Sequence, residues 1–198
     1  AICGEQIKRL TLELGGKSAA IVLDDADLNK TIPEMVMAGL MNTGQACIAQ
    51  TRVLASKQRY AEVVDAVAAF VEKLKIGNPL EEDTVIGPLV SARHRERVES
   101  YISIGREEGA RVVTGGGRPG HASQGWYVEP TVFSDVDNNM RIAREEIFGP
   151  VLSVIPYGDD ADAIRIANDS NYGLCGTVWT EDAERGLAIA RGVRTGTY

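Results

Sequence analysis

Short runs of apolar and β-branched residues alternate along this chain with longer amphipathic stretches, and this alternation restricts the fold more than any other feature. The runs have the length and composition of buried strands and lie at residues 18–23, 52–55, 111–114, 151–157, 175–180 and 195–198. Strands separated by helical segments are typical of a sheet whose strands are mostly parallel. The pattern therefore predicts an α/β domain of three layers, with a largely parallel sheet covered by helices on both faces.

Between these runs, apolar residues recur at the spacing of amphipathic helices. The clearest helix begins near Tyr60, repeats apolar side chains at intervals of three and four residues, and ends before Gly77 and Pro79. Further helices are expected over residues 27–41, 91–109, 160–169 and 182–191. Thr180 precedes the last of these helices, and its hydroxyl is our candidate for the N-cap.

The composition excludes several classes of protein. A chain of 198 residues with 44% hydrophobic content can bury a sizeable core without disulfides or metals. The net charge of −7 disfavours nucleic acid and anionic membranes as partners, since both require a basic surface. The longest apolar run, residues 66–71, is too short to span a bilayer, and no signal peptide is visible.

The three cysteines form no C-x-x-C pair and have no histidines at ligand spacing. This usage argues against a disulfide framework and against a bound metal, and it fits a reducing cytoplasm. The chain opens on Ala1 and stops at Tyr198 within a strand-like segment. We therefore expect it to be a piece of a longer polypeptide.

Cys47 is the first candidate for chemistry. It follows an apolar helical segment and lies in a polar turn, Asn-Thr-Gly-Gln-Ala-Cys. An ionised cysteine is a strong nucleophile, and backbone N–H groups in such a turn can stabilise the thiolate. Most free cysteines are small buried hydrophobes, and this is our interpretation of Cys3 and Cys175. His94 and His121 have the sequence context of ordinary surface residues, which disfavours a Cys-His pair.

Glu13 is the second candidate, 34 residues before the thiol and flanked by Leu12 and Leu14. A carboxylate between apolar neighbours can have a raised pKa and accept a proton in a dry site. Taken alone, Glu13 is better explained as a surface residue on a strand that approaches Gly15 and Gly16. Sequence spacing does not place it beside Cys47.

Residues 145–150 (Glu-Glu-Ile-Phe-Gly-Pro) are the third candidate. The two acids followed by Ile-Phe-Gly-Pro form a rigid turn that can present a carboxylate and an aromatic ring to a nucleotide ribose. The alternative is an acidic helix end with Phe148 in the core. The glycines at 115–117 lack the lysine and the following helix of a phosphate-binding loop.

Three of these motifs occur in an order that resembles the aldehyde dehydrogenase superfamily. They are residues 12–17 (Leu-Glu-Leu-Gly-Gly-Lys), 44–47 (Gly-Gln-Ala-Cys) and 145–150. Residues 171–174 and 194–197 are similar to its later segments. The resemblance covers essentially the whole chain. It implies that residues 17–198 are the catalytic thiol domain and that residues 1–16 are the strand leading into it, which carries the general base.

The resemblance also implies a mechanism for the parent protein. Cys47 attacks an aldehyde to give a thiohemiacetal, NAD or NADP accepts the hydride, and a thioester remains on the sulfur. Glu13 activates the water that releases a carboxylic acid. Glutamate at this position suggests a hydrolytic member of the family.

For the cofactor, the resemblance implies that Glu146 holds the nicotinamide ribose with Phe148 beside it, while Leu14 and Gly15 border the nicotinamide. The main cofactor site would lie in an N-terminal domain that these residues lack, as they lack the C-terminal oligomerisation segment. The isolated chain is therefore not expected to be redox-competent. We expect the parent to be a cytoplasmic homodimer or homotetramer.

Two other functions stay open. The chain can be an inactive scaffold or oligomerisation module that retains the family motifs. It can also be a redox-sensing thiol, which would need a second cysteine close to Cys47, and Cys175 is the candidate.

Overall fold

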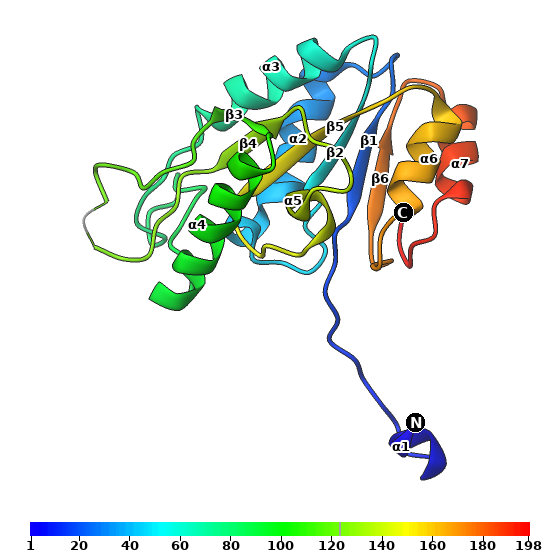
Figure 1. The fold of residues 1–198 in the computed structure, drawn as a ribbon, viewed down its shortest axis with the longest axis horizontal. Coiled ribbons are helices and arrows are strands. Elements are labelled where there is room, and N and C mark those ends of the chain that lie inside the picture. The colour runs from blue at the N-terminus through cyan, green and yellow to red at the C-terminus, as the bar shows by residue number, and fades with distance from the viewer. Residues whose placement is uncertain (123) are drawn as a thin grey trace.

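The computed structural model describes residues 1–122 and 124–198. Its centre is a six-stranded sheet with the order β3-β4-β5-β2-β1-β6 (Figure 1). The strands are β1 (Ala19–Val22), β2 (Arg52–Ser56), β3 (Arg111–Thr114), β4 (Thr131–Ser134), β5 (Val151–Tyr157) and β6 (Gly176–Trp179). Neighbouring strands are parallel, except that β3 runs antiparallel to β4.

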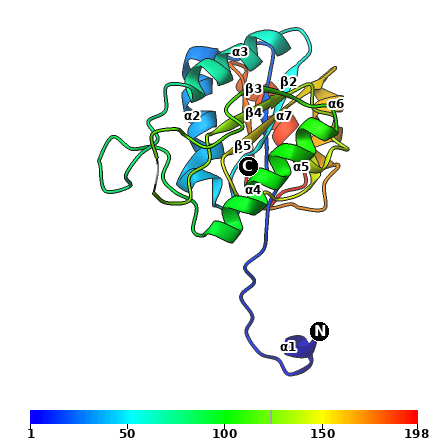
Figure 2. The same ribbon diagram turned by 60° about the vertical axis from the view of Figure 1, so that its left-hand side comes forward.

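Helices cover both faces of this sheet, as Figure 2 shows from a second side. One face is covered by α2 (Leu28–Leu40) and α3 (Tyr60–Val71). The other face is covered by α4 (Ala92–Glu107), α5 (Arg141–Arg144), α6 (Asp160–Asn168) and α7 (Ala183–Gly192). The predicted α/β fold of three layers around a largely parallel sheet is confirmed.

The central strands explain why the apolar runs are continuous. Along β1, Ala20 and Val22 pack with α2 and α3, whereas Ala19 and Ile21 pack with the helices of the opposite face. Successive side chains of a strand point to opposite faces, so a strand covered on both sides needs apolar residues at every position. Ile21 lies beside Leu54 of β2, and both side chains are fully buried.

Short polar side chains start most of the helices. Asp27, Ser91 and Asp159 each accept a hydrogen bond from a backbone N–H in the first turn of α2, α4 and α6. The prediction that Thr180 caps α7 is wrong, because Asp182 accepts from the N–H groups of that first turn. Thr180 lies too early in the chain, and its hydroxyl instead binds the carboxylate of Asp25.

Two strands differ from the prediction. Strand β4 was not expected, because it directly follows the irregular segment that ends at Pro130. Its four residues are nevertheless buried between β3 and β5. The run at 195–198 forms only an isolated bridge, in which Thr197 pairs with Cys175.

Residues 1–14 leave the domain and extend away from it (Figures 1 and 2). They contain one short helix, α1 (Ile2–Glu5), followed by an extended stretch that forms no ladder with the sheet described above. Leu10, Leu12 and Leu14 are each 60–62% exposed. The strand predicted within residues 1–16 stays a prediction, because a strand requires a partner. No helix in the described residues has the length and apolarity to cross a membrane.

Candidate active site

The segments that carry the predicted motifs meet at one edge of the sheet. Gly16 lies shortly before β1, Cys47 shortly before β2, and Pro150 directly before β5. These three strands are adjacent and parallel, so the segments that precede them come together at the amino-terminal edge. The candidate site is therefore at the opposite edge from the one where ligands of open α/β sheets usually bind.

The turn before Cys47 has an unusual backbone. In the 3₁₀ helix η1 (Met41–Gly44), Asn42 and Thr43 have left-handed φ angles of 49° and 58°. The Thr43 hydroxyl accepts from the N–H of Gly87 at 3.0 Å and lies 3.3 Å from the carbonyl oxygen of the same residue. A Cβ on Gly44, whose φ is 71°, would collide with the carbonyl of Gly149. Only glycine fits there.

Two amide side chains complete this turn. Gln45 Nε2 donates to the carbonyl of Asn42 at 3.1 Å, and Asn42 Nδ2 donates back to the carbonyl of Gln45 at 3.2 Å. The N–H of Val90 donates to Gln45 Oε1 at 3.0 Å, which ties the turn to the start of α4. These bonds fix the backbone that leads to the half-buried Cys47.

Gly15 and Gly16 lie between the thiol segment and Glu146. The N–H of Gly16 donates to Glu146 Oε1 at 2.9 Å, and a Cβ on Gly15 would lie 2.5 Å from Glu146 Oε2. A Cβ on Gly16 would overlap the carbonyl oxygen of Cys47. The two glycines therefore let the Cys47 backbone and the Glu146 carboxylate approach the same turn from two sides.

Phe148 is held in a strained conformation, with a left-handed φ of 64°. Such a backbone is costly for an aromatic residue and persists only where its surroundings hold it. Nε2 of His94 lies 2.5 Å from the carbonyl oxygen of Phe148, and the two rings meet edge to face at 6.1 Å. Arg97 donates to the carbonyl of Glu146 at 2.7 Å. His94 is thus not the ordinary surface residue that the sequence suggested.

Of the two adjacent acids, Glu145 has a structural partner set. Arg141 donates to both of its carboxylate oxygens, at 2.8 and 3.0 Å, and the Tyr101 hydroxyl donates to one of them at 2.6 Å. These bonds, chiefly those of Arg141, lower the pKa of Glu145 to about 2. Glu145 therefore helps to hold the segment in place, whereas the Glu146 carboxylate has no ion pair among the described residues and accepts only from the N–H of Gly16.

Glu13 and Leu14 lie on the exposed segment that leaves the domain at Gly15. In the part of the chain that the structure describes, neither the Glu13 carboxylate nor the Cys47 thiol forms a hydrogen bond. The structure brings Cys47, Gly15 and Glu146 together but does not place Glu13 against the sulfur. The roles expected of Glu13 and Leu14 stay predictions.

The complete chain, residues 1–198, matches the family described as "Aldehyde dehydrogenase family". This chain belongs to that family. The predicted resemblance to this family is confirmed.

Similar proteins share this family. A Mycobacterium tuberculosis aldehyde dehydrogenase, solved in complex with NAD⁺, superposes with a TM-score of 0.96 and is 57% identical over 99% of this chain. A geranial dehydrogenase of Castellaniella defragrans is 54% identical over 195 residues, and a betaine aldehyde dehydrogenase of Brucella ovis is 44% identical over 199. The chain spans only about 40% of the length of these relatives.

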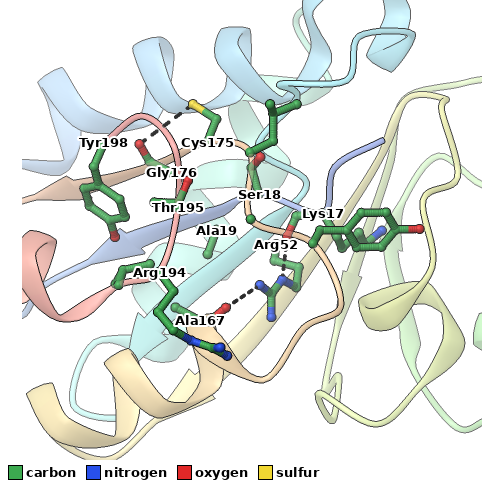
Figure 3. A pocket seen from close by; sticks show the side chains of 14 residues that line it. Lys17, Ser18, Ala19, Arg52, Ala167, Cys175, Gly176, Arg194, Thr195 and Tyr198 are labelled. Carbon is green, nitrogen blue, oxygen red and sulfur yellow. Dashed lines mark hydrogen bonds between the residues drawn. The ribbon is translucent and has the colours of Figure 1, made fainter. Parts of the chain in front are cut away.

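Two buried cations, Arg52 and Lys17, lie near the candidate site, and sequence reasoning assigned a function to neither. Arg52 is 2% exposed and donates to the carbonyls of Lys17, Ile166 and Ala167 and to the Asn138 side chain. Beside it lies a cavity of about 20 Å³, which is large enough for a water molecule but too small for a substrate (Figure 3). The described residues contain no cluster of three or more potential metal ligands.

Proposed function

We propose that this chain is the thiol-bearing part of an enzyme that oxidises an aldehyde to a carboxylic acid with NAD or NADP. One observation carries the proposal: the backbone of Gly15 and Gly16 separates the Cys47 segment from the Glu146 carboxylate. A nucleophile and a group suited to a ribose diol are thereby brought to one turn. Family membership and the aldehydes in the relatives' names support the same reaction.

The chemistry begins at the sulfur. The Cys47 thiolate attacks the aldehyde carbon to form a C–S bond, and the backbone N–H of Cys47 stabilises the developing oxyanion. Removal of a hydride from this thiohemiacetal, which NAD or NADP accepts when bound, leaves a thioester on the sulfur. Glu13 then takes a proton from water as its oxygen attacks the acyl carbon, and cleavage of the C–S bond restores the thiolate.

The residues present fit the nicotinamide half of such a cofactor. The Glu146 carboxylate is half-buried beside the two glycines Gly15 and Gly16. With no side chains in the way there, it can accept hydrogen bonds from a ribose diol. The Phe148 side chain is 37% exposed beside it. Leu14 and Gly15 would border the nicotinamide ring. The adenine and pyrophosphate groups need a further domain, so we expect no turnover from this chain alone.

The remaining expectations belong to the same proposal. Residues 17–198 act as the catalytic domain, and residues 1–16 are the strand that leads into it and carries the general base. That protein is a cytoplasmic homodimer or homotetramer. The choice of aldehyde is set partly outside this chain, because an aldehyde tunnel would need the walls of both domains.

An activated ester tests the thiol without any cofactor. Mixing the chain with nitrophenyl acetate should release one equivalent of nitrophenol per chain, because Cys47 becomes acylated. Cys47→Ala should abolish this release, whereas the matched Cys175→Ala should retain it. Release that is equal in all three proteins, or absent from the unmodified chain, would contradict the proposal and favour an inactive scaffold.

A further inference from the structure

Phe148 keeps a costly backbone conformation that core packing does not explain. Its φ of 64° is left-handed, a region in which aromatic residues are rare. The residue is 37% exposed and belongs to neither hydrophobic cluster of the described residues. Strain of this kind persists only where surrounding groups hold the backbone, and it is concentrated at functional sites. The groups that contact the Phe148 backbone are therefore of interest.

Helix α4 lies along the segment of residues 145–150 and fixes it at both ends. At one end, the Tyr101 hydroxyl donates to the Glu145 carboxylate at 2.6 Å. At the other end, a Cβ on Gly149 would lie 2.5 Å from the Val98 side chain, so the segment and the helix are in close contact there. The backbone between these ends is held against the same helix.

Two donors of α4 reach backbone carbonyls between these ends. Arg97 Nη2 donates to the Glu146 carbonyl at 2.7 Å, and His94 Nε2 lies 2.5 Å from the Phe148 carbonyl oxygen. Residues three apart in a helix lie on one face, so the two donors act side by side. The His94 and Phe148 rings also meet edge to face, with their centroids 6.1 Å apart. His94 therefore contacts both the backbone and the ring of the strained residue.

We propose that His94 is a positioning residue, which donates from Nε2 to the Phe148 carbonyl and thereby holds Phe148 in its left-handed conformation. Both the neutral tautomer with a proton on Nε2 and the imidazolium can form this bond. The contact is independent of the proposed function, and only its consequence rests on that function: with Phe148 beside the nicotinamide ribose, His94 sets the position of one wall of that site. The competing explanation is that the buried neighbours Ile147 and Pro150 hold the turn without the histidine.

The tautomer of His94 tests the proposal without any substitution. In ¹⁵N–¹H NMR spectra of this chain, recorded at a pH where the ring is neutral, the proton should lie on Nε2, because only a protonated nitrogen can donate to a carbonyl. His121 provides a reference ring, since its Nε2 lies 3.0 Å from the Ile76 carbonyl oxygen. A neutral His94 ring with its proton on Nδ1 would overturn the proposal.

Two variants then test the effect on Phe148. A left-handed φ brings the N–H and Hα of one residue close together and gives a strong NOE between them. His94→Leu removes the donor, so the strong NOE of Phe148 should be lost. His94→Gln keeps an N–H donor without the aromatic ring and should retain it. The matched control is His121→Leu, which removes the other histidine and should leave the Phe148 NOE unchanged.

The pattern across the variants decides between the two explanations. An unchanged NOE in His94→Leu would overturn the proposal, because the buried neighbours would then hold the turn. Its loss from both variants would also overturn the proposal, because ring packing and not the hydrogen bond would then be responsible. If His94→Leu does not fold, the tautomer and His94→Gln give the answer. None of these measurements uses an aldehyde or NAD⁺, so a failure of the proposed function would be seen separately, in the ester reaction.

Discussion

The turn that carries Cys47 and the arm that carries Glu13 are opposites in structure, although the proposed reaction needs both. The turn is fixed by the side chains of Thr43 and Gln45 and by backbone packed against Gly149. The arm, residues 1–14, lies outside the domain. The comparison shows that this domain fixes the position of Cys47, the proposed nucleophile, but not that of Glu13, the proposed general base.

The sequence of the arm explains why the domain alone does not fix the position of Glu13. Leu10, Leu12 and Leu14 alternate with polar residues, which places the leucines on one face of an extended strand. A lone strand has no hydrogen-bond partners and no apolar surface to cover its side chains. The arm can therefore hold Glu13 in place only where a second sheet receives it.

Breaking the turn should have the largest effect. Gly44→Ala places a Cβ against the Gly149 carbonyl at a left-handed φ, and should lower the free energy of unfolding by about 3 kcal/mol or more. Urea unfolding measures this. The matched control is Gly109→Ala, where φ is 97° but the space is open, with an expected loss of about 1 kcal/mol. Equal losses at the two sites would show that the turn is not tightly packed.

Lys17 marks the point where the arm becomes part of the domain, and it should make stability depend on pH. Chiefly because of burial, its pKa falls from 10.5 in the unfolded chain to about 7 in the folded one, so between these values the unfolded chain binds more protons. The free energy of unfolding should rise with pH by up to about 1.4 kcal/mol per pH unit above pH 7, and stay level below it. Denaturant unfolding at pH 7–9.5 should show this slope, and Lys17→Met should lack it. If the free energy of unfolding depends on pH in the same way in both proteins, Lys17 is charged in the folded state and the prediction is wrong.

Tyr101→Phe should have a smaller effect, because Arg141 still holds Glu145. Loss of one hydrogen bond to a carboxylate should cost about 1.5 kcal/mol. The low pKa of Glu145 contributes stability above pH 4.5 that is lost as pH falls toward 2, and this acid-induced loss should be smaller in the variant. Tyr127→Phe is the control, because it removes a hydrogen bond to the uncharged carbonyl of Gly77. It should leave the loss of stability at acid pH unchanged.

Removing the arm should have the smallest effect. A chain that begins at Gly15 should unfold within about 0.5 kcal/mol of the complete one, because the deleted residues are exposed. The rate of Cys47 alkylation by iodoacetamide should likewise change less than about twofold. A larger change in either measurement would show that the arm packs on the domain in solution.

The sequence predicted features that depend on neighbouring residues better than contacts between distant parts of the chain. Strands β1, β2 and β5 were recognisable because burial on both faces gives continuous apolar runs. Cys47 was recognisable because a thiol beside Gly44 and two amides is an unusual local combination. Both signals lie within a few neighbouring residues, where periodicity and residue type carry information.

What sequence reasoning missed depends on distant partners. His94 and Arg97 hold carbonyls that lie about 50 residues further along the chain, and nothing local distinguishes them from exposed helix residues. Arg52 and Lys17 flank apolar runs and look like surface charges, although both are 2% exposed. The sequence did offer one signal for the burial of Arg52 and Lys17, since each lies at or near the start of a strand that is buried on both faces.

Because the thiol lies before the strands rather than after them, the candidate site is at one rim of the sheet and away from the other. Strand β1 alone separates the two rims by roughly 13 Å. A fluorophore or affinity tag introduced at the connection between β5 and α6 would report on unfolding without entering the space in which an acyl group is formed and released.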